Sequence, residues 1–404
     1  MADHARSDDT AVQAQLDRFA QLSPGRDILG LERITALLAR LGDPHLALPP
    51  VLHVAGTNGK GSTCAFLRAI LEAAGLTCHV YTSPHLVRFN ERIRIGGRLI
   101  EDAALAPLLA EVLDAAGDIG PSFFEATTAA AFLAFSRAPA DACIVEVGLG
   151  GRLDATNVVR PVVCGIAQLG IDHQAFLGDT LAEIAGEKAG IAKPGIPLVV
   201  MAQASEAMAA IADVATRVGA PVLIEGRDWH VDPALAVGLP GAHQRRNAAL
   251  AIAMLGAQSE LGVDPAAVAQ GLAAARWPGR LQRLADGPLA LGREVWVDGA
   301  HNPAAAQALG DTLASRPMHL VLGILANKDA AGIVGPLAPH ALSLGFVEVA
   351  GHASHDADAI ARRWGGFAAA DLPTALAAGT GPVLIAGSLY LCGEALRLNL
   401  QRLE

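Results

Sequence analysis

The chain has 404 residues, of which 52% are hydrophobic and 17% charged, and its formal net charge is −10 at pH 7. A chain of this length exceeds the usual size of a single core, so we expect two domains. The acidic balance excludes a general nucleic-acid binder, whose affinity comes largely from Lys and Arg on phosphates, whereas a local cluster of cations could still bind a small anion.

Cysteine spacing and the lack of long apolar segments favour an intracellular protein. The five cysteines show no CxxC spacing, and several lie in apolar runs, so we interpret them as buried free thiols. The first ten residues, MADHARSDDT, lack the apolar core of a signal peptide, and no apolar stretch of transmembrane length is free of Gly, Pro and charge. We therefore expect a cytoplasmic protein without membrane contact. Two cores can absorb the apolar fraction, so we expect a monomer.

Short β-rich runs alternate with Ala- and Leu-rich helical stretches, which is typical of a mainly parallel sheet built from βαβ units. The first series of strand candidates is 51–55, 77–81, 142–147, 162–169 and 197–201. The second series is 294–297, 319–325, 344–349 and 382–387. A stretch rich in Pro, Gly and Asp separates the two series. We therefore predict an α/β fold with domains 1–288 and 289–404.

The first strand candidate leads into GTNGKGST, residues 56–63, and then into a helical pattern. Glycines let backbone amides approach phosphate oxygens, the helix N-terminus adds partial positive charge, Lys60 can reach the terminal phosphates, and a hydroxyl can bind Mg²⁺. Because Gly61 separates Lys60 from Ser62, the segment is a variant of the GxxxxGK[ST] P-loop. The alternative is a glycine-rich turn with a structural role only.

Three polar residues follow successive strand candidates and should meet at one edge of the sheet. Ser83 follows the second strand, Glu146 lies near the end of the third, and His173 follows the fourth. Because ligands of α/β sheets bind at the carboxyl ends of the strands, we predict a Mg²⁺ site there. The alternatives are an ion pair of Glu146 with Arg152 or Lys188, and a structural role for His173.

Lys188 continues the apolar face of a predicted helix. The helix opens with a capping box, Thr180 with Glu183, and its apolar face begins at Leu181, seven residues before Lys188. A lysine on a buried stripe has a depressed pKa, and its neutral amine could take up CO₂ as a carbamate. On the pattern alone we favour the alternative, a lysine that snorkels near the helix C-terminus.

The ordered motifs HVAGTNGKGST, TSPHL, FFEATTAAAF, EVGLGGRLDATN, IDH, GEKAGI, HQRRNAA, WPGR and DGAHNP resemble the folylpolyglutamate synthase/dihydrofolate synthase family of the Mur-type ligases. The resemblance runs from about residue 25 to the last strand. It implies an ATP-dependent amide ligase, in which a substrate carboxylate takes the γ-phosphoryl group of ATP and L-glutamate then displaces phosphate. It also implies a smaller, Rossmann-like C-terminal domain.

The resemblance further implies roles for individual residues. ATP would be bound by Asn58, Gly59, Lys60, Gly61, Ser62, Thr63, Asn247, Arg280, Asp298 and His301. Mg²⁺ would be bound by Ser83, Glu146 and His173. The catalytic residues would be Lys60, Lys188, His173 and Glu146, with a carbamate on Lys188 as in relatives, which reverses the preference from the pattern. The pteridine would contact Ile28, Phe124, Leu153, Asp154 and Ala155.

These implied roles have structural alternatives. Phe124 could be a core aromatic residue, Asp154 could be a helix N-cap, and the turn containing Asp298 could simply lead into a Pro-initiated helix. For the whole protein we predict a ligase that joins L-glutamate to dihydropteroate, to folates, or to both. One alternative is a ligase for a cell-wall precursor. The folate-type motif EVGLGGRLDATN disfavours it, and the 50 residues before Val51 are too few for a separate sugar-nucleotide domain. The other is a nucleotide-dependent binding module, disfavoured by the full set of Mg²⁺-ligand candidates.

Overall fold

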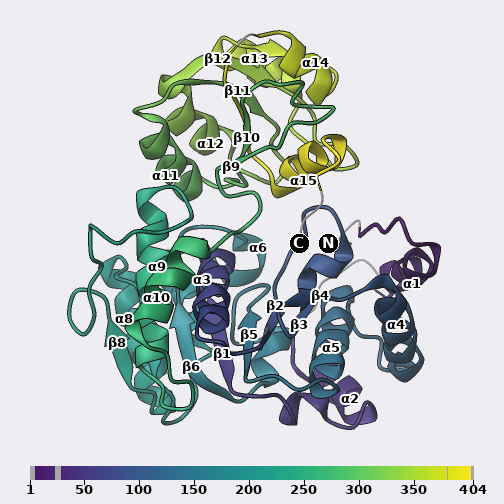
Figure 1. Ribbon diagram of the computed structural model, residues 1–404, viewed down its shortest axis with the longest axis vertical. Coiled ribbons are helices and arrows are strands. Elements are labelled where there is room, and N and C mark those ends of the chain that lie inside the picture. Colours follow the sequence, from purple (N-terminus) through teal and green to yellow (C-terminus); the bar gives the residue numbers. More distant parts are fainter. Residues whose placement is uncertain (1–4, 23–28, 380, 402–404) are drawn as a thin grey trace. The chain divides into compact units, whose positions relative to one another are not determined.

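The computed structural model of the protein describes residues 5–22, 29–379 and 381–401 (Figure 1). The chain folds into two compact units. The first unit comprises Met1–Gly238 and Gln244–Arg276, and the second comprises Leu239–His243 and Trp277–Glu404. The boundary predicted at residue 288 lies inside the second unit, because Gln282 and Arg283 pair with a strand of its sheet.

The first unit is built on a mainly parallel sheet, as predicted. Within the described residues this sheet has eight strands in the order β4-β3-β2-β5-β1-β6-β7-β8. Their bounds are β1 (Val51–Ala55), β2 (Cys78–Tyr81), β3 (Ile93–Ile95), β4 (Arg98–Leu99), β5 (Ala142–Glu146), β6 (Pro161–Ile166), β7 (Leu198–Val200) and β8 (Val222–Ile224). Only β3 and β4 run antiparallel to their neighbours. The five predicted strands of the first series are thereby confirmed as β1, β2, β5, β6 and β7.

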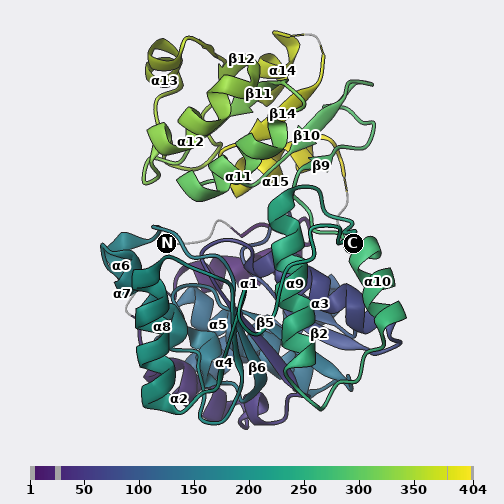
Figure 2. The ribbon, with the colours of Figure 1, turned by 90° about the vertical axis from the view of Figure 1, so that its left-hand side faces the viewer.

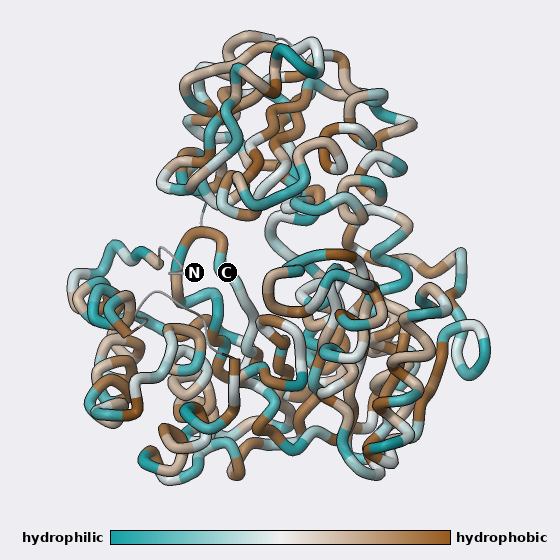
Figure 3. The backbone as a smooth tube through the Cα atoms, turned by 180° about the vertical axis from the view of Figure 1, so that it is seen from behind, coloured by the Kyte–Doolittle hydropathy of each residue, from teal (hydrophilic) through white to brown (hydrophobic). Residues whose placement is uncertain are grey.

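Helices cover both faces of this sheet. The α-helices are α1 (Thr10–Ala20), α2 (Glu32–Arg40), α3 (Lys60–Ala73), α4 (Asp102–Ala116), α5 (Phe123–Ser136), α6 (Gln174–Leu177), α7 (Leu181–Ala189), α8 (Ser205–Val218), α9 (Ala242–Gly256) and α10 (Pro265–Ala274). The 3₁₀ helices are η1 (Pro44–Leu46), η2 (Phe89–Arg92) and η3 (Ala155–Val158). In Figure 2, α3, α9 and α10 lie on one side of the sheet, and α7 and α8 lie on the other. The brown segments of the tube in Figure 3 mark the hydrophobic stretches of the chain, and the buried core includes strand residues such as Val54, Ile144 and Ile166.

The second unit has its own sheet, which is also mainly parallel. Within the described residues it has six strands in the order β13-β12-β11-β14-β10-β9, and only β9 is antiparallel. The strands are β9 (Gln282–Arg283), β10 (Val295–Val297), β11 (Met318–Leu322), β12 (Ala341–Phe346), β13 (Phe367–Ala368) and β14 (Val383–Ala386). The helices are α11 (Pro303–Leu313), α12 (Ala330–Leu337), η4 (Ala338–His340), α13 (Ala357–Trp364), α14 (Leu372–Ala377) and α15 (Leu389–Leu398).

Two strands of the second series differ from their predictions: β11, predicted over 319–325, ends at Leu322, and β12 begins earlier than predicted. The sequence predicts a strand over 344–349, whereas β12 begins at Ala341 and ends at Phe346. The reason is pairing with β11, which matches Met318 with Ala341 and Leu322 with Phe346. The start of the strand, Ala341 to Ser343, is therefore stabilised by its neighbour rather than by burial of its own side chains.

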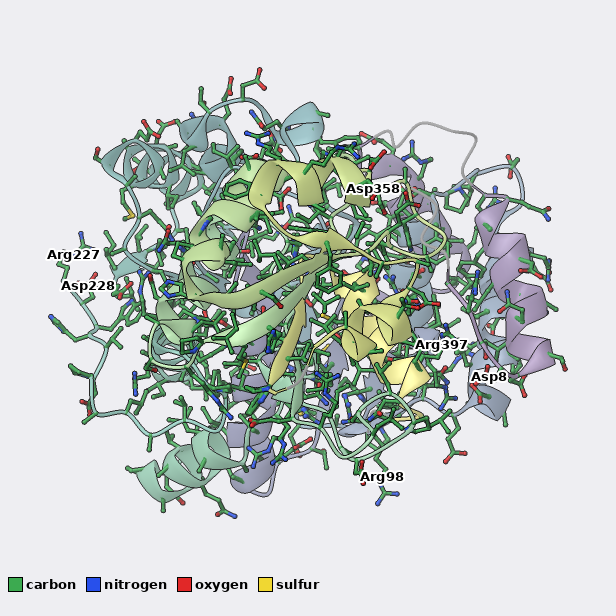
Figure 4. All side chains as sticks on the ribbon, turned by 90° about the horizontal axis from the view of Figure 1, so that it is seen from above. Asp8, Arg98, Arg227, Asp228, Asp358 and Arg397 are labelled. Atoms are coloured by element: carbon green, nitrogen blue, oxygen red, sulfur yellow. The ribbon has the colours of Figure 1, made fainter. Side chains whose placement is uncertain are left out.

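Charged side chains surround these cores. Arg227 and Asp228, labelled in Figure 4, form an ion pair of 2.8 Å at the periphery of the first unit. All five cysteines are buried free thiols, as predicted. Within the described residues, no helix has both the length and the apolar character needed to cross a membrane.

Candidate active site

The strand order of the first unit brings the predicted site residues to one edge of its sheet. The four adjacent strands β2, β5, β1 and β6 are all parallel. Their carboxyl ends therefore lie side by side, which is where α/β sheets bind ligands. Ser83 follows β2, Glu146 ends β5, the glycine-rich loop follows β1, and His173 follows β6.

The glycine-rich loop forms the expected turn from a strand to a helix. β1 ends at Ala55 and α3 starts at Lys60, with Gly59 at the N-cap in a left-handed conformation, φ 86°. No described side chain caps this helix, so its first N–H groups are presented to a ligand. The backbone N–H groups of Thr57 and Asn58 donate to the Gln168 carbonyl at 2.9 and 3.1 Å, which fixes the loop to the segment after β6.

The Lys60 side chain folds over this loop. Its Nζ donates to the carbonyl oxygens of Gly56 at 3.0 Å and Thr57 at 3.2 Å. The ammonium group therefore lies above the N-terminus of α3, which is the position that phosphate recognition requires. In the same turn the Thr63 hydroxyl is buried and has no hydrogen-bond partner among the residues that the structure describes. A buried hydroxyl is costly to leave unpaired, so Thr63 is an unsatisfied polar group at the start of α3.

Asn247 lies directly against the loop. A Cβ atom at Gly59 would collide with Asn247 Oδ1. Asn247 is buried, and its Nδ2 donates to Gln244 Oε1 at 3.0 Å. Sequence reasoning missed Gln244, although two amide side chains three residues apart in HQRRN, on one face of α9, could have indicated it.

Ser83 and Glu146 meet directly. The Ser83 backbone N–H donates to Glu146 Oε2 at 3.1 Å, and the Glu146 side chain is buried. Arg152, one of the alternative partners considered for Glu146, instead forms an ion pair with Glu187 at 2.8 Å. His173 starts the turn into α6 with φ 55°, and its Nε2 lies 4.0 Å from Asp172 Oδ2.

The donor chemistry at this edge fits a hard divalent cation. Glu146 and Ser83 supply oxygen atoms, which Mg²⁺ and Mn²⁺ prefer, and His173 supplies an imidazole. Within the described residues, no group of three or more His, Cys, Asp or Glu side chains could hold a metal ion. The predicted set has only two such side chains beside the Ser83 hydroxyl, so bound phosphates and water would have to complete the coordination.

The loop that carries Ser83 is held by its own side chains. Glu91 accepts hydrogen bonds from the backbone N–H groups of Leu86, Val87 and Arg88, at 2.7, 2.9 and 2.6 Å. Burial raises the pKa of Glu91, and these three bonds oppose the shift. Sequence reasoning missed this support, because the motif FNER looks like an exposed turn.

Lys188 is buried, which contradicts the snorkelling interpretation. Lys188 lies in the last turn of α7, and only 4% of the residue is exposed. The helix begins with the capping box that the sequence predicts. Burial lowers the pKa of Lys188 to about 7, and the neighbouring Lys60 ammonium contributes to the same shift. The carboxylates of Asp172 and Asp154 act in the opposite direction and raise this pKa. A substantial fraction of neutral amine therefore exists at neutral pH.

The predicted pteridine residues lie on α5 and on the loop after β5. The Phe124 ring packs against Gly148, where no side chain could fit, and its centroid lies 6.1 Å from that of Tyr81. Asp154 caps η3, which confirms the structural alternative for this residue. It accepts from Leu149 N at 2.8 Å and Thr156 N at 3.0 Å. Leu153 and Ala155 flank it, and Ile28 lies outside the described residues.

The second unit arranges its predicted nucleotide residues around the end of β10. Asp298 accepts from Leu281 N and Ala300 N, each at 2.8 Å, and His301 Nδ1 donates to the Gly299 carbonyl at 2.8 Å. A Cβ atom at Gly299 would lie 2.6 Å from Arg280 Nη1, so the guanidinium covers this turn.

The same turn leads into α11, which Asn302 caps and Pro303 begins, as the structural alternative predicted. His243, which sequence reasoning missed, belongs to this unit and is influenced by Asp298 and Arg280. Burial is the main cause that lowers the pKa of His243. The motif HQRRNAA begins with this histidine, but the residues that influence it in the second unit are distant in sequence, so the motif gave it no role.

Comparisons with known proteins agree with this geometry. Residues 279–388 match the model of the family described as Mur ligase, glutamate ligase domain. The folylpolyglutamate synthase of Lacticaseibacillus casei is 36% identical over 95% of this chain and 96% of its own length. A protein of Halobacterium salinarum, named probable bifunctional folylpolyglutamate synthase/dihydropteroate synthase, is 36% identical over 91% of this chain. The chain spans only 49% of that protein's length.

Solved structures share both the fold and the chain length. Escherichia coli FolC in complex with DHPP and ADP superposes with a TM-score of 0.88 at 33% identity, covering 96% of this chain and 97% of that one. The bifunctional folylpolyglutamate synthase/dihydrofolate synthase of Yersinia pestis, complexed with AMPPNP and Mn ion, gives a TM-score of 0.86 at 33% identity. It covers 97% of this chain and 99% of that one.

Proposed function

We propose that this chain, which belongs to the folylpolyglutamate synthase/dihydrofolate synthase family, is an ATP-dependent ligase that joins L-glutamate to the carboxylate of a pterin substrate. The homologues support this reading over a cell-wall precursor ligase. The observation that carries the proposal is the convergence of the loops after β2, β5, β1 and β6, with Lys60 above an uncapped helix and Glu146 beside Ser83.

The first step is transfer of the γ-phosphoryl group of ATP to the acceptor carboxylate, which forms an acyl phosphate and releases ADP. Transfer between two anions requires positioning and charge neutralisation rather than a protein nucleophile. The backbone amides from Asn58 to Ser62, the hydroxyl of Thr63 and the Lys60 ammonium would hold the phosphates. We assign Asn247 to the adenine region, and Arg280, Asp298 and His301 to the nucleotide from the second unit.

The second step is attack of the glutamate amine on the acyl carbon. The new C–N bond forms as the C–O bond to phosphate breaks, and the amine loses its proton to solvent or to a nearby base. Phosphate leaves, so each turnover yields one ADP and one phosphate.

Ser83, Glu146 and His173 would hold the divalent cation. The Mn ion in the Yersinia pestis complex with AMPPNP supports a metal–nucleotide site in this family. When bound, such a cation neutralises phosphate oxygens and orients the terminal phosphoryl group. The contribution of the chain is to keep the Glu146 carboxylate aimed at this edge, through the hydrogen bond from the Ser83 N–H.

We assign to Lys188 a carbamate formed with CO₂. The neutral amine attacks carbon dioxide, an N–C bond forms, and one proton leaves to solvent, which replaces a neutral amine by an anion. The buried position and the pKa of about 7 support this assignment. We expect added bicarbonate to raise kcat of the wild-type protein and to leave Lys188→Met unaffected. Equal responses of the two proteins would argue against a carbamate.

We assign the pteridine to the surface formed by Phe124, Asp154 and the neighbours of Asp154. The half-buried Phe124 ring, whose tip packs against Gly148, would offer a stacking face. Asp154 already accepts several hydrogen bonds, so we expect it to orient the loop and to accept only one further donor from the pterin.

The proposal is tested by phosphate release from purified protein with ATP, Mg²⁺ and L-glutamate, with either dihydropteroate or tetrahydrofolate as acceptor. Release with dihydropteroate alone identifies a dihydrofolate synthase, release with tetrahydrofolate alone a folylpolyglutamate synthase, and release with both a bifunctional enzyme. Lys60→Ala should abolish release in each case. No release above the acceptor-free rate with either acceptor would contradict the proposal.

We also propose that the protein acts as a monomer in the cytoplasm. Five buried free thiols support a reducing compartment. Size-exclusion chromatography with light scattering would test the monomer, whose mass is 41.4 kDa. A mass of twice that value would contradict it.

A further inference from the structure

The loop between β5 and β6, residues 148–158, connects three parts of the proposed site. At Gly148 it packs against the Phe124 ring. At its middle, a Cβ atom on Gly151 would lie 2.7 Å from the Lys188 carbonyl, and the Arg152 N–H donates to the Glu187 carbonyl at 2.8 Å. The loop therefore contacts both the proposed pterin surface and the helix turn that carries Lys188.

The loop is also fixed to β1, the strand that leads into the phosphate loop. His53 lies in the middle of β1 and is fully buried. Its Nε2 is 2.9 Å from Thr156 Oγ1, and that hydroxyl is 2.5 Å from Asp154 Oδ1. Asp154 Oδ2 in turn accepts from Leu149 N at 2.8 Å. A continuous chain of hydrogen bonds thus runs from the centre of the sheet to the first residues of the loop.

The donors in this chain follow from its chemistry. A carboxylate only accepts, so the single Thr156 proton is donated to Asp154. The Thr156 oxygen must then accept from His53, which places the imidazole proton on Nε2. His53 Nδ1 is a buried acceptor with no partner among the described residues, so within them the bond to Thr156 is the hydrogen bond that orients the ring.

We propose that His53 is a positioning residue, which through Thr156 sets the position of the 148–158 loop and so of the pterin and Lys188 surfaces. This inference rests on the proposed function. His53 touches no reacting atom, because its ring is enclosed within the first unit. A second anchor, Lys193 Nζ donating to Asn157 O and Oδ1 at 2.9 Å each, holds the far end of the loop. His53 therefore controls the end that carries Asp154.

Burial makes the anchor insensitive to pH. Burial, with a smaller contribution from Lys193, lowers the pKa of His53 to about 3. The ring stays neutral at every pH at which the enzyme works, so it donates the same hydrogen bond throughout. One fixed protonation state suits His53 to positioning, in contrast to Lys188 on α7, whose pKa of about 7 lets it titrate.

The test compares His53→Leu, which removes the donor, with His53→Gln, whose amide can donate from a position close to that of Nε2. We expect His53→Leu to raise KM for the pterin acceptor about tenfold, the effect of losing about 1.4 kcal/mol of positioning. KM for ATP should stay within about twofold, and His53→Gln should recover most of the loss. A matched control is His79→Leu, another fully buried histidine of the same sheet that bonds to Ala138 and Gly96 instead.

A merely structural role would lower thermal stability in both His53→Leu and His79→Leu and leave the acceptor KM of the folded protein unchanged. That outcome would overturn the proposal, as would equal rises in KM for acceptor and ATP. Should His53→Leu fail to fold, His53→Leu combined with Thr156→Val removes both partners of the bond and carries the same expectation.

A measurement without substrate separates this inference from the proposed function. In the wild-type protein, ¹⁵N NMR should show His53 as the Nε2–H tautomer with a slowly exchanging proton. Hydrogen exchange of the 148–158 loop should accelerate in His53→Leu while that of the phosphate loop does not. An Nδ1–H tautomer, or unchanged exchange, would overturn the inference even if the ligase is active. Both expected results without any ligase activity would overturn only the proposed function.

Discussion

Replacing Lys188 by methionine should stabilise the first unit at neutral pH, although it removes a residue of the proposed catalytic site. The fold lowers the pKa of Lys188 from 10.5 to about 7, chiefly because burial disfavours the ammonium form. At about 1.4 kcal/mol per pKa unit, this shift corresponds to roughly 5 kcal/mol of unfavourable interaction with the charged amine. Methionine has a similar shape and no charge to bury, so the variant escapes this cost.

The sign of the pH dependence follows from proton binding. Between pH 7 and 10.5 the unfolded chain binds a proton at Lys188 that the folded chain does not, so the free energy of unfolding of the wild-type unit rises with pH across this window. The contribution of the charged amine is fully destabilising below pH 7 and disappears above 10.5. The stability difference between Lys188→Met and wild type should therefore be largest at pH 7 and shrink as the pH approaches 10.5.

The assay is unfolding in guanidinium chloride at several pH values in CO₂-free buffer. Guanidinium is chosen because urea releases cyanate, which modifies amines. Pulse proteolysis, with fragments identified by mass, reports the two units separately. Lys328→Met, in the second unit, is the control and should leave the first unit unchanged. A difference between Lys188→Met and wild type that is the same at pH 7 and pH 10 would refute the reasoning from burial.

Three further outcomes can be checked. Gly59→Ala should raise KM for ATP at least tenfold, because the new methyl group would collide with Asn247. The control Gly75→Ala is also at positive φ but has open space around it. It should cost only backbone strain, about 1–2 kcal/mol in stability, and leave KM for ATP unchanged. Thr180→Ala removes the cap of α7 and should cost about 1 kcal/mol in thermal unfolding, while Thr216→Ala, exposed within α8, should be nearly neutral. Chelation of divalent cations should stop phosphate release, and Mg²⁺ or Mn²⁺ should restore it.

The elements that sequence reasoning identified are those whose signals are local. β1, the glycine-rich turn and α3 are contiguous, so an apolar run, glycines and a helical pattern sufficed to predict them. The positions of Ser83, Glu146 and His173 at strand ends followed in the same way. Their meeting at one edge required only that the strands be parallel, which the βαβ alternation indicated.

The missed strands depend on pairing with a neighbouring strand rather than on a signal of their own. β4, β9 and β13 have two residues each, too few for any periodic signal, and exist because an adjacent strand pairs with them. The shift of β12 has the same cause. Lys188 is the corresponding case for a side chain: its helix alone favoured snorkelling, but the residue is buried in the folded unit, where the 148–158 loop packs against the carbonyl groups at the end of α7.

Lys60 and Lys188 together explain why this edge can serve two kinds of chemistry. The Lys60 ammonium group makes protonation of Lys188 less favourable. Lys188 is also deeply buried, and this burial lowers its pKa further than the repulsion alone. In the proposed function, Lys60, held by the carbonyl groups of its own loop, would be the cation for phosphate, while Lys188 would supply a neutral amine. Uptake of CO₂ would convert the repulsion into attraction, because an anionic carbamate next to the Lys60 ammonium is favourable. The same pair of lysines that opposes protonation of Lys188 therefore favours its modification.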